Sequence, residues 1–368
     1  MIGQVFSYAY VQARTRTLKS RLLDHDDWHY LMRMRRLDDI LRYLSATNYG
    51  PFLPLTSIDR NDIRSISLSL HDALFADYLK LIAALPRCRT TILYGLAARY
   101  DAENIKTLLS GIWKLSPEPS IRPLIYRTGR LSRLPLDTML HIRNIPEAVD
   151  SLKKTVFHAP LMHALPRFQT QDKLFPLEMA ADMAAFHSLS DRIGRLQGVD
   201  RQYASRLTGA FVDGTNLSWI VRFRWSYGLS PEEIINYFLP HGRLITLHDM
   251  GNLARASDLP TFLNALPLPY RHQLENVQRW DQIQTYFQTW QESELYRLFR
   301  RNPFHIGLPI SYLLLKEWEV KALDGLISAV EAGQTVDGIL NIWQGGWLHN
   351  SRNARTGNPL KGRTDVQK

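Results

Sequence analysis

The stretch RRLDDILRYLSATNY at residues 35–49 recurs in weaker form as RNIPEAVDSLKKTVF at residues 143–157. The two align without a gap at an offset of 108 residues, and five positions match: Arg35 with Arg143, Leu37 with Ile145, Leu44 with Leu152, Thr47 with Thr155 and Tyr49 with Phe157. A third copy follows 114 residues further on, where Ile145, Val149 and Leu152 match Leu259, Leu263 and Leu266. Self-similarity at a nearly fixed period indicates a chain built from repeated units.

Other features of the sequence keep nearly the same spacing. Gly129-Arg130-Leu131 recurs as Gly242-Arg243-Leu244, Asp101 with Asn104 recurs as Asp213 with Asn216, and a weaker third copy contains Glu319 within residues 317–320. Short similar helices also align by chance, but several features at one offset favour a true repeat. Since the units are much longer than solenoid repeats, we predict three pseudo-symmetric helical bundles around a central axis, at residues 1–110, 111–220 and 221–350.

Helical periodicity runs through the chain. Tyr8, Val11, Thr15 and Leu18 fall at i, i+3, i+7 and i+10, which is one face of a helix. The sequence Ser230-Pro231-Glu232-Glu233 combines an N-cap serine, a proline at the first helical position and a capping box, so it predicts a helix start. Regular alternation of the kind that predicts strands and hairpins is missing from the sequence. The sequence therefore predicts an all-α protein.

Composition limits the class of protein. The 368 residues are 45% hydrophobic, enough for a sizeable core, and the single cysteine, Cys88, excludes an internal disulfide or a cysteine-based zinc site. The most apolar stretch, residues 306–315, is about half of the roughly 20 residues that span a membrane. We expect a buried helix start there, and a protein that is soluble or peripheral to a membrane. The net charge is +10. Residues 351–368 are basic and lack apolar periodicity, so we predict a disordered tail there.

The sequence predicts no catalytic, cofactor-binding or metal site. Phosphate-binding glycine loops and the HExxH and GxSxG motifs are absent. His25 and His29 have helical i, i+4 spacing, but no third ligand follows at a recognisable distance, which argues against a metal site.

Some polar residues are expected to have structural roles. A residue that recurs once per unit is better suited to capping or bridging helices than to catalysis, which needs one asymmetric constellation. We also expect Lys316, Glu317 and Glu319 to form a solvent-exposed face with local ion pairs. The repeat-equivalent structural positions predicted on this basis are Asp101, Asn104, Asp213, Asn216 and Glu319.

Three segments resemble the C-subunit family of V/A-type (vacuolar/archaeal-type) ATPases and ATP synthases, which is homologous to the d-type protein of eukaryotic V-ATPases. YAYVQARTRTLKSRLL at residues 8–23, followed by RRLDDILRYLSATNYGPFL, resembles the family's first repeat. ARYDAENIKTLLSG at residues 98–111 resembles its D-x-x-NIK-x-LLR segment, and PISYLLLKEWEVKALDGLI at residues 309–327 resembles its closing segment. Ser110, Ala322 and Asp324 depart from the residues that are usual in the family, so the interface residues of the family need not transfer to this chain.

The resemblance implies a funnel-like, non-catalytic central-stalk subunit that links the stalk to the membrane proteolipid ring. Such a subunit transmits torque for ion transport coupled to ATP hydrolysis or synthesis. The implied partners are the stalk subunits and the ring, with one copy per complex on the cytoplasmic face of the membrane and a monomer when isolated. No cofactor, small-molecule substrate or specific nucleic acid is implied. The alternatives are a basic helical nucleic-acid-binding protein, suggested by the net charge, and a hydrolase with an unrecognised site.

Overall fold

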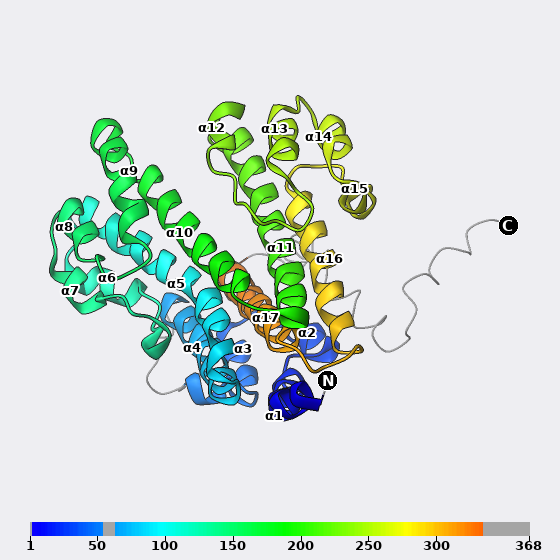
Figure 1. The fold of residues 1–368 in the computed structure, drawn as a ribbon. Helices are drawn as coiled ribbons and strands as arrows, with labels where there is room; N and C mark the ends of the chain where they lie inside the picture. Colours follow the sequence, from blue (N-terminus) through cyan, green and yellow to red (C-terminus); the bar gives the residue numbers. More distant parts are fainter. Residues whose placement is uncertain (1, 54–62, 334–368) are drawn as a thin grey trace.

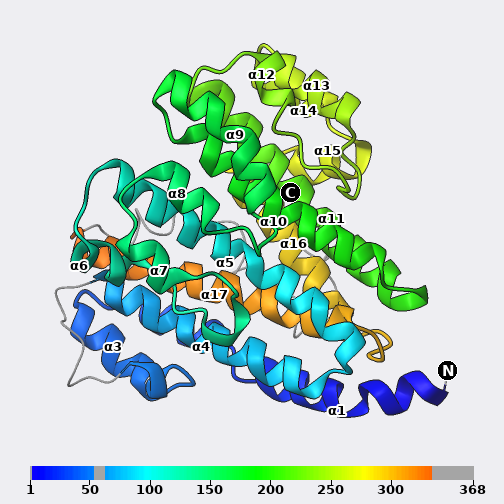
Figure 2. The ribbon, with the colours of Figure 1, turned by 60° about the vertical axis from the view of Figure 1, so that its left-hand side comes forward.

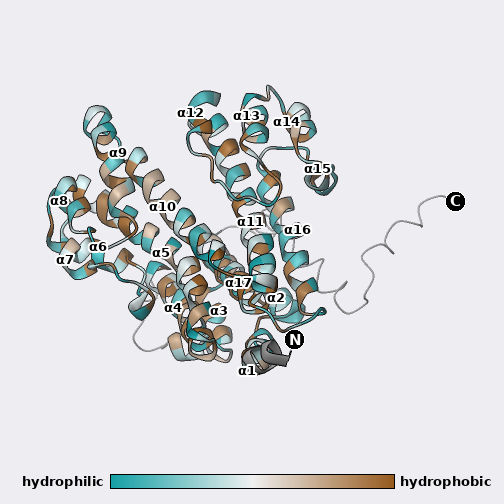
Figure 3. Ribbon diagram, viewed as in Figure 1, coloured by the Kyte–Doolittle hydropathy of each residue, from teal (hydrophilic) through white to brown (hydrophobic). Residues whose placement is uncertain are grey.

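The long helices lie side by side in pairs (Figures 1 and 2). The protein is represented by a computed structural model that describes residues 2–53 and 63–333. In these pairs α4 (Ile63–Ala84) packs against α17 (Gly307–Glu331), α5 (Arg87–Trp113) against α10 (Phe175–Gly194), and α11 (Gly198–Val221) against α16 (Gln282–Leu298). The first helix, α1 (Ile2–Lys19), lies against both α4 and α17. Figure 3 shows hydrophobic and hydrophilic residues on the same helices, as expected for amphipathic packing.

Three groups of short helices, here called heads, pack against these long helices. The first head (residues 20–53) contains α2 (His25–Leu31) and α3 (Leu37–Ser45). The second head (residues 114–174) contains α6 (Glu118–Ile121), α7 (Leu136–His141), α8 (Ile145–Asp150) and α9 (His158–Gln171). The third head (residues 222–281) contains α12 (Pro231–Ile235), α13 (Leu247–Arg255), α14 (Leu259–Ala265) and α15 (Leu268–Leu274). Short 3₁₀ turns occur at Gly50–Phe52, Arg122–Leu124 and Gly129–Leu131, and a π turn at Arg222–Ser226.

Buried apolar side chains are grouped by head. One cluster joins the first head to α1, α4 and α17, and it extends into the beginnings of α5 and α11 and the ends of α10 and α16. A second cluster joins the second head to α5 and α10. A third joins the third head to α11 and α16. Each head therefore shares a hydrophobic core with its own pair of long helices, and burial of this area is the main force that holds it there.

The prediction of an all-α protein is confirmed for the described residues, which form helices, turns and connecting segments but no strand. The predicted helix start is present at α12, where Ser230 and Glu233 form a capping box. Residues 306–315 begin α17 and are buried, as expected. Within the described ranges, none of the helices has the length and apolar character needed to cross a membrane. The predicted basic tail at residues 351–368 lies outside the described residues.

Candidate functional site

Asn104 on α5 and Asn216 on α11 bind their heads in the same way. Nδ2 of Asn104 donates to the carbonyl of Tyr126 at 3.0 Å, and its Oδ1 accepts from the N–H of the same residue at 2.8 Å. Nδ2 of Asn216 donates to the carbonyl of Leu239 at 2.9 Å, and its Oδ1 accepts from the N–H of Leu239 at 3.0 Å. Both asparagines are completely buried. Each side-chain amide thus pairs with both backbone groups of one head residue, which lies 22 or 23 positions further along the chain. The amide takes the place of a second backbone strand or turn as the hydrogen-bonding partner.

Asp213 lies three residues before Asn216 and binds a second part of the third head. Its carboxylate accepts from the N–H groups of residues 243, 244 and 245 at 2.9, 2.8 and 3.3 Å, and from the hydroxyl of Tyr270 at 2.5 Å. Burial raises the pKa of Asp213 to about 6, although these hydrogen bonds oppose the rise. A Cβ at Gly242 would collide with Oδ1 of Asp213, so this turn requires glycine. The repeated Gly-Arg-Leu motif thus contributes the glycine and two of the donors for this carboxylate.

Asp101 on α5 has fewer partners than Asp213. The side chain of Ser132, in the second head, acts on the carboxylate of Asp101 and lowers its pKa. One carboxylate oxygen, Oδ1, is buried and has no partner among the described residues. Burial raises the pKa of Asp101 to about 7, and the effect of Ser132 only partly opposes this.

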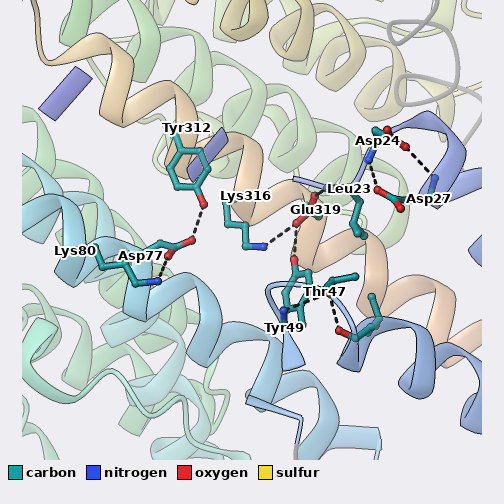
Figure 4. A network of polar contacts seen from close by, with 11 residues as sticks. Leu23, Asp24, Asp27, Thr47, Tyr49, Asp77, Lys80, Tyr312, Lys316 and Glu319 are labelled. Atoms are coloured by element: carbon teal, nitrogen blue, oxygen red, sulfur yellow. Dashed lines mark hydrogen bonds and ion pairs between the residues drawn. The ribbon is translucent and has the colours of Figure 1, made fainter. Parts of the chain in front are cut away.

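Glu319 on α17 holds the first head (Figure 4). Its carboxylate accepts from the N–H of Leu23 at 2.6 Å and from the hydroxyl of Tyr49 at 2.7 Å. Lys316 donates to the same carboxylate at 2.8 Å and lies over the Tyr49 ring, 3.7 Å from its centroid. A buried ion pair is tolerated only when the remaining hydrogen-bond donors and acceptors of both groups have partners. Here the Leu23 N–H and the Tyr49 hydroxyl supply further donors to the carboxylate. Glu319 thus accepts from a backbone N–H and a tyrosine hydroxyl of a head, as Asp213 does.

The expectation that Lys316, Glu317 and Glu319 form a solvent-exposed face is wrong. All three side chains are buried, with exposed fractions of 0%, 2% and 0%. The reason is that α17 contacts α1, α3, α4, α11 and α16, so these positions have no face left toward solvent. Charge along a helix predicts exposure only when the helix lies on the surface.

Glu317 forms the second buried ion pair of α17. Two nitrogens of Arg99 on α5 bind its two carboxylate oxygens at 3.1 and 2.6 Å, and Lys321 binds at 2.8 Å. Burial alone would raise the pKa of Glu317, but the charges of Arg99 and Lys321 outweigh it and lower the pKa to about 2. The bidentate geometry fixes the position of α5 relative to α17.

Two buried aspartates that were not singled out in the sequence also link helices. Asp77 on α4 accepts from the hydroxyl of Tyr312 at 2.5 Å and from Lys80 at 2.7 Å (Figure 4). Asp200 at the start of α11 binds three other elements: the hydroxyl of Tyr8 at 2.8 Å, the N–H of Ile306 at 2.9 Å and Arg89 at 2.8 Å. Neither aspartate belongs to a repeated motif, and no local signal marks their burial.

The candidate site is therefore a set of polar contacts that hold heads and helices together. In the described part of the chain, no group of three or more His, Cys, Asp or Glu side chains is arranged to hold a metal ion. His25 and His29 stack on each other, with ring centroids 6.1 Å apart. The hydrogen bonds and ion pairs of this site restrain the heads against the long helices.

Comparison with known proteins identifies the family. Residues 11–341 match the family model described as ATP synthase (C/AC39) subunit. The chain is 24% identical to the C subunit of the A-type ATP synthase of Methanocaldococcus jannaschii, over 89% of this chain and 84% of the relative. It is 24% identical to the corresponding protein of Halobacterium salinarum strain R1, over 90% and 96%, and 25% identical to that of Halorubrum lacusprofundi, over 90% and 95%. The chain therefore belongs to the ATP synthase (C/AC39) subunit family.

Proposed function

We propose that this protein is a non-catalytic coupling subunit of a V/A-type rotary ATPase. In this role it joins the central stalk to the membrane proteolipid ring and transmits torque for ion transport. Membership of the ATP synthase (C/AC39) subunit family supports the proposal, as does the similarity to C subunits of A-type ATP synthases. Close-packed helices suit the task because protein interiors have low compressibility and transmit strain.

The observation that carries the proposal is the contact between the first head and α17. Leu23 and Tyr49 bind Glu319 across 296 and 270 positions of the sequence. The first part of the described chain is thereby fastened to its last helix, inside one hydrophobic cluster. A subunit whose first and last elements moved independently would open under torque, whereas this contact resists opening.

We further propose that the three heads and their inner helices form equivalent bundles around a central axis. The inner helices in this scheme are α17, α5 and α11, with Glu319, Asp101 and Asp213 in corresponding places. The division at residues 110 and 220 falls within the last turns of α5 and α11, so it separates each inner helix from the head that it holds. Superposing α5 and the second head on α11 and the third head should overlay Asn104 on Asn216 after a rotation of about a third of a turn. Placement of the two asparagines on different faces would refute the equivalence.

The proposal implies the stalk subunits and the proteolipid ring as partners, with one copy of this protein on the cytoplasmic face. Expression with an affinity tag, together with the other rotary ATPase subunits of the same genome, tests this directly. Stalk subunits should co-purify with the tagged protein in a one-to-one ratio, and the isolated protein should be monomeric and show no ATP turnover. Failure to recover any rotary ATPase subunit under conditions where the rest of the complex assembles would refute the proposal.

A further inference from the structure

The connections between the long helices gather at one end of the molecule. Helices α4, α10 and α16 end there, and α5, α11 and α17 begin there, on the side away from the second and third heads (Figures 1 and 2). We call this region the connector end and define it as residues 85–89, 191–201 and 297–306. Three separate parts of the sequence come together there, so a charge that all three carry forms one patch only in the folded protein.

The connector end is strongly basic. Its segments contain eight arginines and two aspartates, a net charge of +6, with no lysine and no glutamate. One of the aspartates, Asp200, is buried and already bonded to Arg89. Only Asp191 is an exposed acid there. Six arginines of the connector end are exposed: Arg87, Arg195, Arg201, Arg297, Arg300 and Arg301.

A cleft between α11 and α16 extends this basic surface. Arg206, Arg243, Arg297 and Arg301 line it, together with apolar side chains that include Leu298 and Trp318. Among the described residues that line it, Glu294 is the only one with a carboxylate, and it forms ion pairs with Arg206 at 2.7 Å, Arg297 at 2.5 Å and Arg243 at 3.7 Å. One carboxylate shared by three guanidinium groups leaves the cleft with an excess of positive charge.

We infer that the connector end and this cleft are the docking surface for an acidic polypeptide surface of a neighbouring protein. Guanidinium groups bind carboxylates with two parallel hydrogen bonds, and the apolar walls of the cleft suit side chains between acidic residues. A membrane fits less well, since none of the exposed large apolar side chains of the described chain lies in the connector end. A nucleic-acid strand fits less well too, since the connector end presents no exposed aromatic ring for stacking. The inference rests on the proposed function in one respect, which is that the neighbour is another subunit of the rotary complex.

The test compares charge reversals in the connector end with charge reversals of the same size elsewhere on the protein. R87E/R195E/R301E places one reversal on each connection, and R87Q/R195Q/R301Q removes the same charges without reversing them. The matched control, K114E/K154E/K173E, reverses three exposed charges in the second head. Circular dichroism and thermal melting first verify that all three variants fold like the parent.

Binding to a fluorescent oligoglutamate peptide is the direct measurement. R87E/R195E/R301E should weaken binding about tenfold or more and the glutamine variant should weaken it less, while the control should leave it within about twofold. The affinity of the parent should fall with salt. Equal affinities for the connector and control variants would overturn the inference. Tighter binding of the parent to vesicles of phosphatidylserine and phosphatidylcholine, or to a mixed-sequence DNA duplex, would overturn it as well.

Co-purification separates this inference from the proposed function. If the parent and the control recover rotary ATPase subunits and R87E/R195E/R301E loses one of them, the inference is supported. If all of them recover the same subunits, the connector end is not the docking surface, although the proposed function stands. If the parent recovers none, the proposed function fails, and the peptide measurement alone decides whether the connector end binds acidic polypeptide.

Discussion

Asp101 on α5 and Asp213 on α11 each lie three residues before the asparagine that binds a head, yet their surroundings differ. Asp213 receives three backbone N–H groups and the hydroxyl of Tyr270. Asp101 receives no such donors, and its Oδ1 is buried without a partner in the described structure. The second and third heads thus share the asparagine contact and differ in the aspartate contact.

The position of Phe157 offers a reason for the difference. Tyr270 lies 113 residues after Phe157, the same offset that separates Gly129 from Gly242. In the first head, Tyr49 aligns with Phe157 and gives its hydroxyl to Glu319. If this offset of 113 residues relates the heads, the second head has phenylalanine where the other two have tyrosine, and we infer that it lacks the hydroxyl donor. A buried acceptor without a partner costs about 1–3 kcal/mol, and we infer that the second head is held less strongly than the third.

The largest effect should come from Asp213→Ala. This change leaves three backbone N–H groups and the Tyr270 hydroxyl without their acceptor, so the free energy of unfolding should fall by about 3 kcal/mol or more. Asp101→Ala removes an acceptor that has far fewer donors and should cost at most about 1 kcal/mol. Urea denaturation of both variants, followed by circular dichroism, measures the difference. Equal losses would show that the two contacts are energetically alike and would break the comparison.

Asn104→Ala and Asn216→Ala should have nearly equal effects. Each removes two buried hydrogen bonds to one head residue, so each should cost about 2 kcal/mol. Hydrogen exchange should become faster at the amides of Tyr126 and Leu239, respectively. Asn252→Ala, at an exposed position of α13, serves as the control and should cost less than about 0.5 kcal/mol. Strongly unequal costs for the two buried asparagines would count against their equivalence.

The stability contributed by Asp101 should depend on pH. Its pKa is about 7 in the folded protein against 3.8 as the reference value, so only the folded state keeps this proton between these values. Stability from this group is therefore complete below about pH 4 and is lost as the pH rises through about 7. Between about pH 5 and pH 8, the parent should lose about 1 kcal/mol or more relative to Asp101→Asn, which stays neutral. Parallel pH profiles for the two proteins would show that Asp101 titrates normally.

The smallest predicted effect is a gain in stability. Phe157→Tyr supplies the hydroxyl that the other two heads have and should raise the free energy of unfolding by up to about 1 kcal/mol. It should also lower the pKa of Asp101, because the new donor stabilises the charged carboxylate. Tyr270→Phe is the opposite change and should destabilise the third head and raise the pKa of Asp213. Destabilisation by Phe157→Tyr, with an unchanged pKa of Asp101, would show that Phe157 does not face this carboxylate.

Much of the architecture was predictable from the sequence because it depends on local signals. Helical periodicity, the capping box at Ser230 and the apolar start of α17 all correspond to elements of the structure. The repeat offset also pointed to Asn104 and Asn216, which make the same contact with their heads.

The errors and omissions concern long-range burial. Lys316, Glu317 and Glu319 have the composition of an exposed helix face, but other helices cover α17, and local pattern carries no information about this. Arg99 and Asp200 were missed for the same reason, because their partners lie 218 and 192 positions away. Tyr49 could have been found, since the repeat alignment included it, but only the structure shows its bond to Glu319.

The most direct test of coupling is the number of ions transported per ATP hydrolysed. It is measured in vesicles that contain the rotary complex reconstituted with and without this protein. Without the protein, ATP hydrolysis by the catalytic subunits should continue while ion transport falls to background, and adding the purified protein should restore transport. Glu319→Leu, which releases the first head from α17, should restore it less well than the parent. Full transport in complexes that lack the protein would contradict the proposed function.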